Sequence, residues 1–313
     1  MAVPRITVDL DRPPRQRWDV LAPQVDAARA LMRAYTRDLG LTGDMASLLA
    51  HYLDAHVQAD FREELEGVAE VLGCSLLEAA TGNLYYDALK LVLGCTAVST
   101  DGPDGPIHAR NLDWWSDDGA LARYTAIFDF YQGGKLAFTT VGWPGFIGAM
   151  SGVAPGRFAV TLNAVDSREP IVPGQPVVFL LREVLRAAPD FQAAVVALSG
   201  TELVSDVLLL VSGAQAGERV VIERTPTRHA LRTGSPLVVT NDYRALTVDG
   251  RGETELQATA CARFDRATAL AAQGTDGFAL LEDPAVKMGI TVQHMLLYPA
   301  TGEVEVRLPA GVG

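Results

Sequence analysis

The feature that most constrains this chain is a change of pattern at residue 95. Before that point, apolar residues recur at helical spacing in Val25–Leu39 and again in residues 45–72, with Gly73 as a stop signal. From Cys95 onward, short runs rich in β-branched residues alternate with turn residues, which is the pattern of strands. A helical leader therefore precedes a region of hairpins with inserted helices, and this order predicts an α+β layered fold.

The expected elements follow from the same patterns. Ser75 and Glu78 have the spacing of a capping box, which predicts a helix running from there toward Leu93. The glycine-rich stretch 142–156 is the best candidate for a functional loop. Strands are expected at residues 95–100, 106–111, 124–131, 136–141, 157–163, 207–211, 219–223, 291–298 and 303–308, and further helices at 176–187, 190–198 and 257–272.

Composition excludes some classes of partner. The chain has 313 residues, enough for one large domain or two ordinary ones, and its net charge is -12 with a pI of about 4.9. An acidic surface argues against nucleic-acid binding, because phosphate affinity needs clustered Lys and Arg. It also argues against electrostatic docking on anionic lipid, although not against apolar contact with a membrane.

The cysteines and the N-terminal residues bear on location. Three cysteines, Cys74, Cys95 and Cys261, form neither a disulfide framework nor a zinc motif, which favours a reducing compartment. The first residues lack the charged start and apolar run of a signal peptide. No apolar stretch reaches the roughly 18 residues of a transmembrane helix, so stable membrane insertion is not expected. These observations predict a cytoplasmic protein.

Cys95 is the residue on which a chemical interpretation centres. It follows Gly94 directly, and a hairpin returning after about 15 residues would bring Arg110 and Asp113 back beside it. An arginine near a thiol favours the thiolate, and a carboxylate can hold an amine by hydrogen bonding. The alternatives are a buried structural cysteine, the role expected for Cys74 and Cys261, and a structural ion pair between Arg110 and Asp113.

Several segments together resemble the family of acid ceramidase and N-acylethanolamine acid amidase. That family carries a Cys-Thr strand followed by His-Gly-Arg-Asn-(Leu/Met)-Asp, and this chain has Cys95-Thr96 followed by His108-Ala109-Arg110-Asn111-Leu112-Asp113. The likeness covers nearly the whole chain. The likeness continues in residues 6–18, 64–70, 83–86 (shortly before Cys95) and 239–243.

The resemblance implies a choloylglycine hydrolase-like, N-terminal-nucleophile hydrolase with an αββα four-layer sandwich. Such a precursor would cleave itself between Gly94 and Cys95, giving a helical segment 1–94 and a catalytic domain 95–313 that stay together as a heterodimer. The freed α-amine of Cys95 would act as general base, with a reference pKa of about 7.7–8.0. The resemblance implies no metal and no cofactor.

Three more residues match active-site positions of that family. Asn241 is expected to donate to the oxyanion, Arg263 matches an active-site arginine, and Asn163 lies near a further polar position. Each has a simpler interpretation: Asn241 as a turn residue, Arg263 as a surface charge with Arg266 as competitor, and Asn163 as the start of a turn. The chain departs from the family at Ala164, in Cys261-Ala262-Arg263, and in the Asp242-Tyr243 order.

The substrate side is expected to be apolar. In the family a segment like 143–150 helps shape the acyl pocket, so Trp143, Phe146 and Ile147, with Trp114, are candidates to bind an acyl chain; core packing is the alternative. The leading hypothesis is hydrolysis of an N-acyl amide, most simply a fatty-acyl amide, through an acyl-Cys95 thioester. Transfer of the acyl group to an amine and a non-catalytic lipid-binding role are the alternatives.

Overall fold

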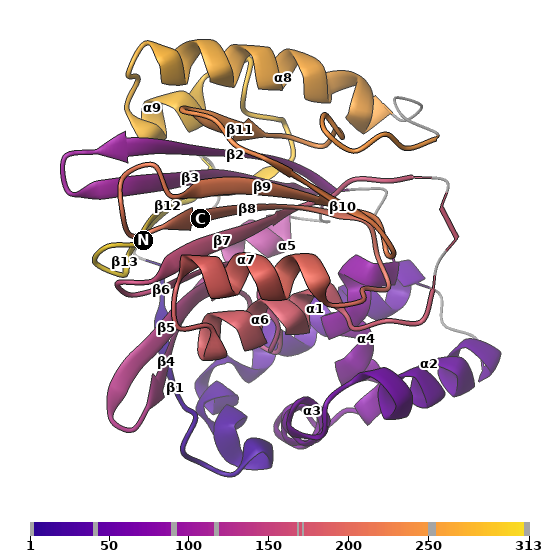
Figure 1. Cartoon of the computed structure of the whole chain (residues 1–313). Coiled ribbons are helices and arrows are strands. Elements are labelled where there is room, and N and C mark those ends of the chain that lie inside the picture. The colour runs from indigo at the N-terminus through magenta and orange to yellow at the C-terminus, as the bar shows by residue number, and fades with distance from the viewer. Residues whose placement is uncertain are drawn as a thin grey trace.

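Two β-sheets lie face to face, and helices cover both outer faces (Figure 1). The computed structural model describes residues 3–39, 43–88, 93–115, 119–167, 169–170, 172–249 and 255–309. The expected α+β fold with an αββα arrangement is confirmed.

The larger sheet has eight strands in the order β1-β4-β5-β6-β7-β8-β9-β10. Neighbouring strands are antiparallel except β1 and β4, which run parallel. Because β1 lies in the leader, the leader supplies an edge strand of this sheet as well as helices. The bounds are β1 Arg5–Asp9, β4 Ala126–Gln132, β5 Lys135–Gly142, β6 Ser151–Ala154, β7 Phe158–Asn163, β8 Val207–Gly213, β9 Arg219–Arg224 and β10 His229–Arg232.

The smaller sheet has five strands in the order β11-β2-β3-β12-β13. Its centre is the hairpin of β2 and β3, in which Ala97 is opposite Arg110 and Gly94 is opposite Asp113. The predicted hairpin is therefore confirmed, and it extends past the proposed cleavage point. The bounds are β2 Leu93–Gly102, β3 Gly105–Trp114, β11 Leu237–Val239, β12 Thr291–Tyr298 and β13 Glu303–Arg307.

The helices form the outer layers. Helices α6 and α7 lie on the eight-stranded sheet, and α8 and α9 lie on the five-stranded sheet (Figure 1). The helices of the leader pack mainly against one another and against α6, on the same side of the molecule as α6 and α7. The capping box is present, since Ser75 N donates to Glu78 Oε2 at 2.8 Å and Glu78 N donates to Ser75 Oγ at 3.2 Å. The bounds are η1 (3-10) Pro14–Gln24, α1 Val25–Leu39, α2 Gly43–His56, α3 Ala59–Leu72, α4 Leu76–Ala88, α5 Ala120–Arg123, α6 Val177–Ala187, α7 Phe191–Gly200, α8 Glu255–Ala272 and α9 Gly277–Glu282.

Two expectations need correction. The helical run expected over residues 45–72 is two helices, because the chain turns between α2 and α3 and Gln58 has the extended backbone of a helix N-cap. The stretch expected as a functional loop is irregular over residues 143–150, but it also contains β6, and residues 141–154 are all buried. Within the described residues, no helix combines the length and apolar character needed to span a membrane.

Candidate active site

Cys95 lies near the start of β2 and is completely buried. Its Sγ is 3.2 Å from Nη2 of Arg110, which reaches it from the neighbouring strand β3, and 3.7 Å from the carbonyl oxygen of Leu162 in β7. The two side chains meet because Cys95 and Ala97 face the same side of β2, and Arg110 is opposite Ala97. That side faces the eight-stranded sheet, so the thiol lies between the two sheets.

Arg110 is held in place by groups of the opposite sheet. Its Nη1 donates to the carbonyl oxygen of Met150 at 2.9 Å and to Oγ of Ser151, and its Nη2 donates to the carbonyl oxygen of Leu162 as well as to Cys95. A guanidinium fixed by neutral acceptors keeps its positive charge available to a thiolate. The predicted approach of Arg110 to Cys95 is therefore present in the structure.

Asp113 lies in β3 directly opposite Gly94, beside the proposed scissile bond. Its Oδ1 accepts a hydrogen bond from Oγ1 of Thr291, whereas its Oδ2 has no hydrogen-bond partner among the described residues and lies 4.0 Å from Nη1 of Arg263. Burial raises the pKa of Asp113, and the Thr291 bond opposes that rise. An open, buried carboxylate oxygen is well placed to receive an ammonium group formed at residue 95.

Asn241 contacts the backbone of Cys95 through its side-chain oxygen. Its Oδ1 accepts from Cys95 N at 3.0 Å and from Nη2 of Arg263 at 2.8 Å, and its Nδ2 donates to the carbonyl oxygen of Ala164 at 2.8 Å. Because both neighbours of Oδ1 are donors, the amide orientation is fixed by the network. Nδ2 carries two hydrogens, so its bond to Ala164 is compatible with donation to an oxyanion, and Oδ1 adds a contact that holds the nitrogen of Cys95.

Arg263 and its competitor Arg266 are clearly separated. Arg263 is buried, and its Nη1 donates to the carbonyl oxygen of Cys95 at 2.7 Å and to Oγ1 of Thr96 at 3.0 Å. Burial lowers the pKa of Arg263, and the nearby Asp113 carboxyl opposes this change. Arg266 lies on the outer side of α8 and pairs with Asp283 at 2.6 Å. The structure thus brings Arg263, and not Arg266, to the cysteine.

Asn163 ends β7, as expected, and ties this strand to the segment that carries Asn241. Its Nδ2 donates to the carbonyl oxygens of Val239 at 3.2 Å and Thr240 at 2.9 Å. Its buried Oδ1 has no hydrogen-bond partner within the part of the chain that the structure describes. Asn163 therefore supports the position of Asn241 and presents one open acceptor.

The four residues expected to bind an acyl chain are all buried: Trp114, Trp143, Phe146 and Ile147. Trp143 makes edge-to-face contacts with Trp114 at 5.6 Å and Phe146 at 6.1 Å between ring centroids. Of the four, Trp143 and Phe146 line a small apolar cavity, which is too narrow to hold a water molecule in this structure. All four residues also belong to the main hydrophobic core, which agrees with the alternative interpretation of core packing.

Sequence reasoning missed several groups around this centre. Ser151 and Thr291 fix Arg110 and Asp113, and α1 contributes Met32 and Tyr35 to the cavity wall. The helical spacing of α1 predicts that Met32 and Tyr35 are buried, but it does not tell which cavity they line. Among the described residues, no cluster of three or more His, Cys, Asp or Glu could hold a metal ion, and all three cysteines are free.

Two facing sheets of mainly antiparallel strands, covered by helices on both outer sides, are the fold of the N-terminal-nucleophile hydrolases. A solved structure with this fold, the Caenorhabditis elegans ortholog of N-acylethanolamine-hydrolyzing acid amidase, matches with a TM-score of 0.53 and 24% identity, over 66% of this chain and 93% of that one.

Sequence comparison points to the same relatives. The chain is 30% identical over 236 residues to N-acylethanolamine-hydrolyzing acid amidase of Cavia porcellus (71% of this chain, 65% of that protein), and 27% identical over 253 residues to acid ceramidase of Mus musculus (71% and 64%). No protein-family model matches. The chain is thus a homologue of these proteins, as its motifs predicted, and it spans about 65% of the Cavia porcellus protein's length.

Proposed function

We propose that this chain is a self-processing amide hydrolase that uses Cys95 as its nucleophile. The observation that carries the proposal is the convergence on one residue of three groups with different tasks: Arg110 at the sulfur, Asn241 at the nitrogen and Arg263 at the carbonyl oxygen. A structural cysteine needs none of these contacts. The homology to amidases and ceramidases supports the same activity.

Maturation would begin with attack of Sγ of Cys95 on the carbonyl carbon of Gly94. The C–S bond forms, the C–N bond to Cys95 breaks, and the thiol proton goes to the departing nitrogen. Water then opens the thioester, leaving a carboxylate on Gly94 and a free amine on Cys95. Gly94 suits this step because it has no side chain to obstruct the approach. The open Oδ2 of Asp113, opposite Gly94, would accept a hydrogen bond from the new amine.

Turnover would use both ends of the new N-terminal residue. The α-amine, with a reference pKa of about 7.7–8.0, takes the thiol proton, and Arg110 stabilises the thiolate. The thiolate attacks the substrate carbonyl, and the amine returns the proton to the leaving nitrogen. Water then hydrolyses the acyl-Cys95 thioester. Asn241 and Asp113 hold the amine so that its lone pair faces Sγ.

The substrate we propose is an N-acyl amide with an apolar, fatty-acyl group. Relatives named for hydrolysis of N-acylethanolamines, and the apolar cavity walled by Trp143 and Phe146, support this choice. An apolar wall favours an acyl chain, because burial of each methylene group contributes about 0.8 kcal/mol to binding.

The test is the state of the purified protein. We expect two chains, 1–94 and 95–313, of about 10 and about 23 kDa in proportion to length, which stay together as a heterodimer. The larger chain should begin Cys-Thr-Ala. Cys95→Ala should remain a single chain, and the matched control Cys261→Ala, which changes an exposed free cysteine, should be processed normally. Active protein that stays uncut would refute the mechanism.

Acyl transfer is the second candidate, because every group around Cys95 is buried and a site with little water favours an amine acceptor. Adding ethanolamine during turnover of a different acyl amide separates the two. A new acylethanolamine product that rises with ethanolamine indicates transfer, and fatty acid alone indicates hydrolysis.

A cytoplasmic location remains a prediction, supported by the unpaired cysteines and tested by cell fractionation.

A further inference from the structure

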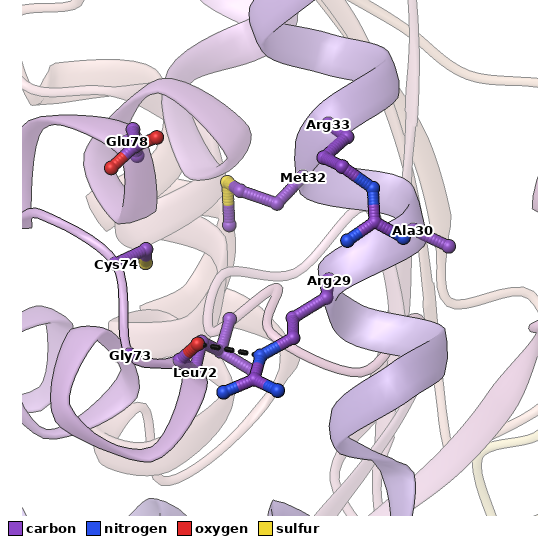
Figure 2. Close-up of a pocket in the computed structure, with 8 residues that line it drawn as sticks. All are labelled: Arg29, Ala30, Met32, Arg33, Leu72, Gly73, Cys74 and Glu78. Carbon is purple, nitrogen blue, oxygen red and sulfur yellow. Dashed lines mark hydrogen bonds between the residues drawn. The ribbon is translucent and has the colours of Figure 1, made fainter.

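A hollow of about 770 Å³ opens on the leader, between α1 and the turn that joins α3 to α4 (Figure 2). This volume lies within the range of small-molecule sites. The hollow is separate from the catalytic groups, all of which come from residues beyond 94. Its lining is Arg29, Ala30, Met32, Arg33, Leu72, Gly73, Cys74 and Glu78.

The charges of the hollow favour an anion. Arg29 and Arg33 are four residues apart in α1 and so share one face of the helix. Arg29 is oriented by its Nε, which donates to the carbonyl oxygen of Leu72 at 2.7 Å (Figure 2). The one acid in the lining, Glu78, is engaged in the capping box, where its Oε2 accepts from N and Oγ of Ser75 at 2.8 Å. Two cations thus face the hollow in a chain of net charge -12.

The backbone leaves room for the guanidinium of Arg29. Gly73 ends α3 with a φ of 61°, a conformation that residues with a side chain rarely adopt. A Cβ at this position would lie 3.1 Å from Nη2 of Arg29. Gly73 therefore has two roles: it adopts the left-handed conformation that ends α3, and its missing side chain leaves space beside the guanidinium of Arg29.

The inner wall of the hollow is apolar and adjoins a second cavity. Met32 lines the hollow and also the narrow apolar cavity that Trp143 and Phe146 line. Its thioether lies against Gly82 of α4, where a Cβ would be only 2.9 Å from the sulfur. Met32 is thus the partition between a cationic outer hollow and an apolar inner cavity. Methionine has three rotatable bonds and adapts easily to a new neighbour.

We propose that the hollow binds a long-chain carboxylate, with its head group at Arg29 and Arg33 and its tail displacing Met32 toward Trp143. The order of features, cations outside and an apolar cavity inside, matches the order of groups in such a molecule. The choice of a fatty acid rests on the proposed function, because that reaction releases one. A bound fatty acid would occupy the cavity offered to the substrate's acyl chain, so the product should inhibit its own formation.

Binding is tested on the full chain carrying Cys95→Ala, which cannot react. Titration calorimetry with decanoate and decanol, both below micelle-forming concentrations, should give one site that prefers the carboxylate by about tenfold or more, as expected for charge-assisted hydrogen bonds. Arg29→Ala with Arg33→Ala should abolish that preference. The matched control, Arg12→Ala with Arg62→Ala, removes two other leader arginines that pair with Asp19 and Asp54, and it should retain the preference.

A second measurement locates the ligand. In Cys95→Ala the remaining cysteines are Cys74, which lines the hollow, and Cys261, which is exposed on α8. Decanoate should slow alkylation of Cys74 by N-ethylmaleimide and leave Cys261 unchanged, as followed by mass spectrometry. The paired arginine variant should lose this protection.

Three results would overturn the proposal: equal affinity for decanoate and decanol, protection of Cys74 that does not depend on Arg29 and Arg33, or binding seen only to vesicles of anionic phospholipid. The last would assign the arginines to a membrane surface. Because Cys95→Ala is inert, these results are independent of whether the wild-type chain cleaves itself, and failure of self-cleavage leaves the binding test intact.

Discussion

Around Cys95, different side chains act on different atoms of the same residue. Arg110 contacts the sulfur, Asn241 contacts the nitrogen, and Arg263 contacts the carbonyl oxygen. Arg263 also donates to Asn241. If cleavage frees the nitrogen of Cys95 as proposed, Asn241 and Arg263 together would orient the resulting amine, so a change at Asn241 should affect the base more than the nucleophile.

Asn241→Ala should lower kcat, by about 10²–10³-fold if its amide donates to the oxyanion, which is the range found for removal of one such donor. Asn241→Asp keeps the acceptor that faces Cys95 and Arg263 but loses the Nδ2 donor. If orientation of the amine is the main role, Asn241→Asp should retain clearly more activity than Asn241→Ala. Equal losses in the two variants would favour the oxyanion role first expected from the sequence.

His108 makes the free energy of unfolding depend on pH. It is fully buried between the sheets, with Nδ1 2.9 Å from Oγ of Ser212 and Nε2 2.8 Å from Oγ1 of Thr161. Burial first, and then the charge of Arg110, lower the pKa of His108 from 6.5 to about 3. Between these values the unfolded chain binds a proton that the folded chain does not, so stability falls as the pH falls.

The expected contribution is a loss of about 1.4 kcal/mol per pH unit below pH 6.5, ending near the folded pKa. Urea unfolding of Cys95→Ala at pH 7, 6 and 5 measures this slope. His108→Gln in that background should be less stable at pH 7 but show a shallower slope, whereas His51→Gln, at an exposed position, should keep the original slope. Parallel slopes for all three chains would contradict the assignment.

At the scale of elements, long and regular patterns were predictable and short ones were not. Val25–Leu39 was expected with the bounds that the structure has, and so was the strand over 291–298, which is β12. The strands β1, β10 and β11 were missed because three to five residues are too few to establish a period. Their position depends on a neighbouring strand, which is information that local sequence does not contain.

The site shows the same division. The spacing of the hairpin predicted that Arg110 and Asp113 lie near Cys95. The two strands are adjacent in sequence, and their register follows from the turn. Asn241 and Arg263 were found only through resemblance to a family, since they are 146 and 168 residues from Cys95. The supporting residue Thr291, which bonds Asp113 from β12, had no sequence signal because threonine is common in strands.

The segment between β5 and β6 should set the preference for acyl length. If the cavity at Trp143 and Phe146 receives the acyl chain, kcat/KM should rise by up to about fourfold per methylene and then stop. Phe146→Leu enlarges the cavity, so the limit should move to a longer chain. Val196→Ala, at an exposed apolar position on α7, serves as the control and should keep the wild-type limit. A profile without any length dependence would place the acyl chain elsewhere.

At the scale of the whole molecule, a buried ion pair joins the leader to the rest of the chain. Glu64 of α3 accepts from both terminal nitrogens of Arg182 of α6, at 2.5 and 2.9 Å, and also from Trp18 Nε1 at 2.6 Å. The guanidinium of Arg182 lies 4.9 Å from the ring centroid of Phe130. After cleavage at Gly94 this contact would connect two separate chains.

Glu64→Gln leaves the buried charge of Arg182 without its counterion, which should lower the free energy of unfolding by about 3–5 kcal/mol in the uncut Cys95→Ala chain. In processed protein the same change should release the small chain on gel filtration. Glu66→Gln is the matched control, because Glu66 forms a solvent-exposed pair with Arg15, and exposed pairs contribute little to stability. A stable Glu64→Gln heterodimer would show that apolar packing alone holds the chains.

The parallel pairing of β1 with β4 has one more consequence. The leader begins as an edge strand of one sheet, and the proposed cut lies in the other sheet. Before the cut, the two parts find each other as segments of one polymer, so folding is unimolecular and independent of protein concentration. Afterwards, an unfolded molecule could recover only through an encounter of two solutes, whose rate falls with dilution. Cleavage would then make unfolding effectively irreversible at low protein concentration. The lifetime of the processed protein would depend on a slow rate of unfolding and not on repeated refolding.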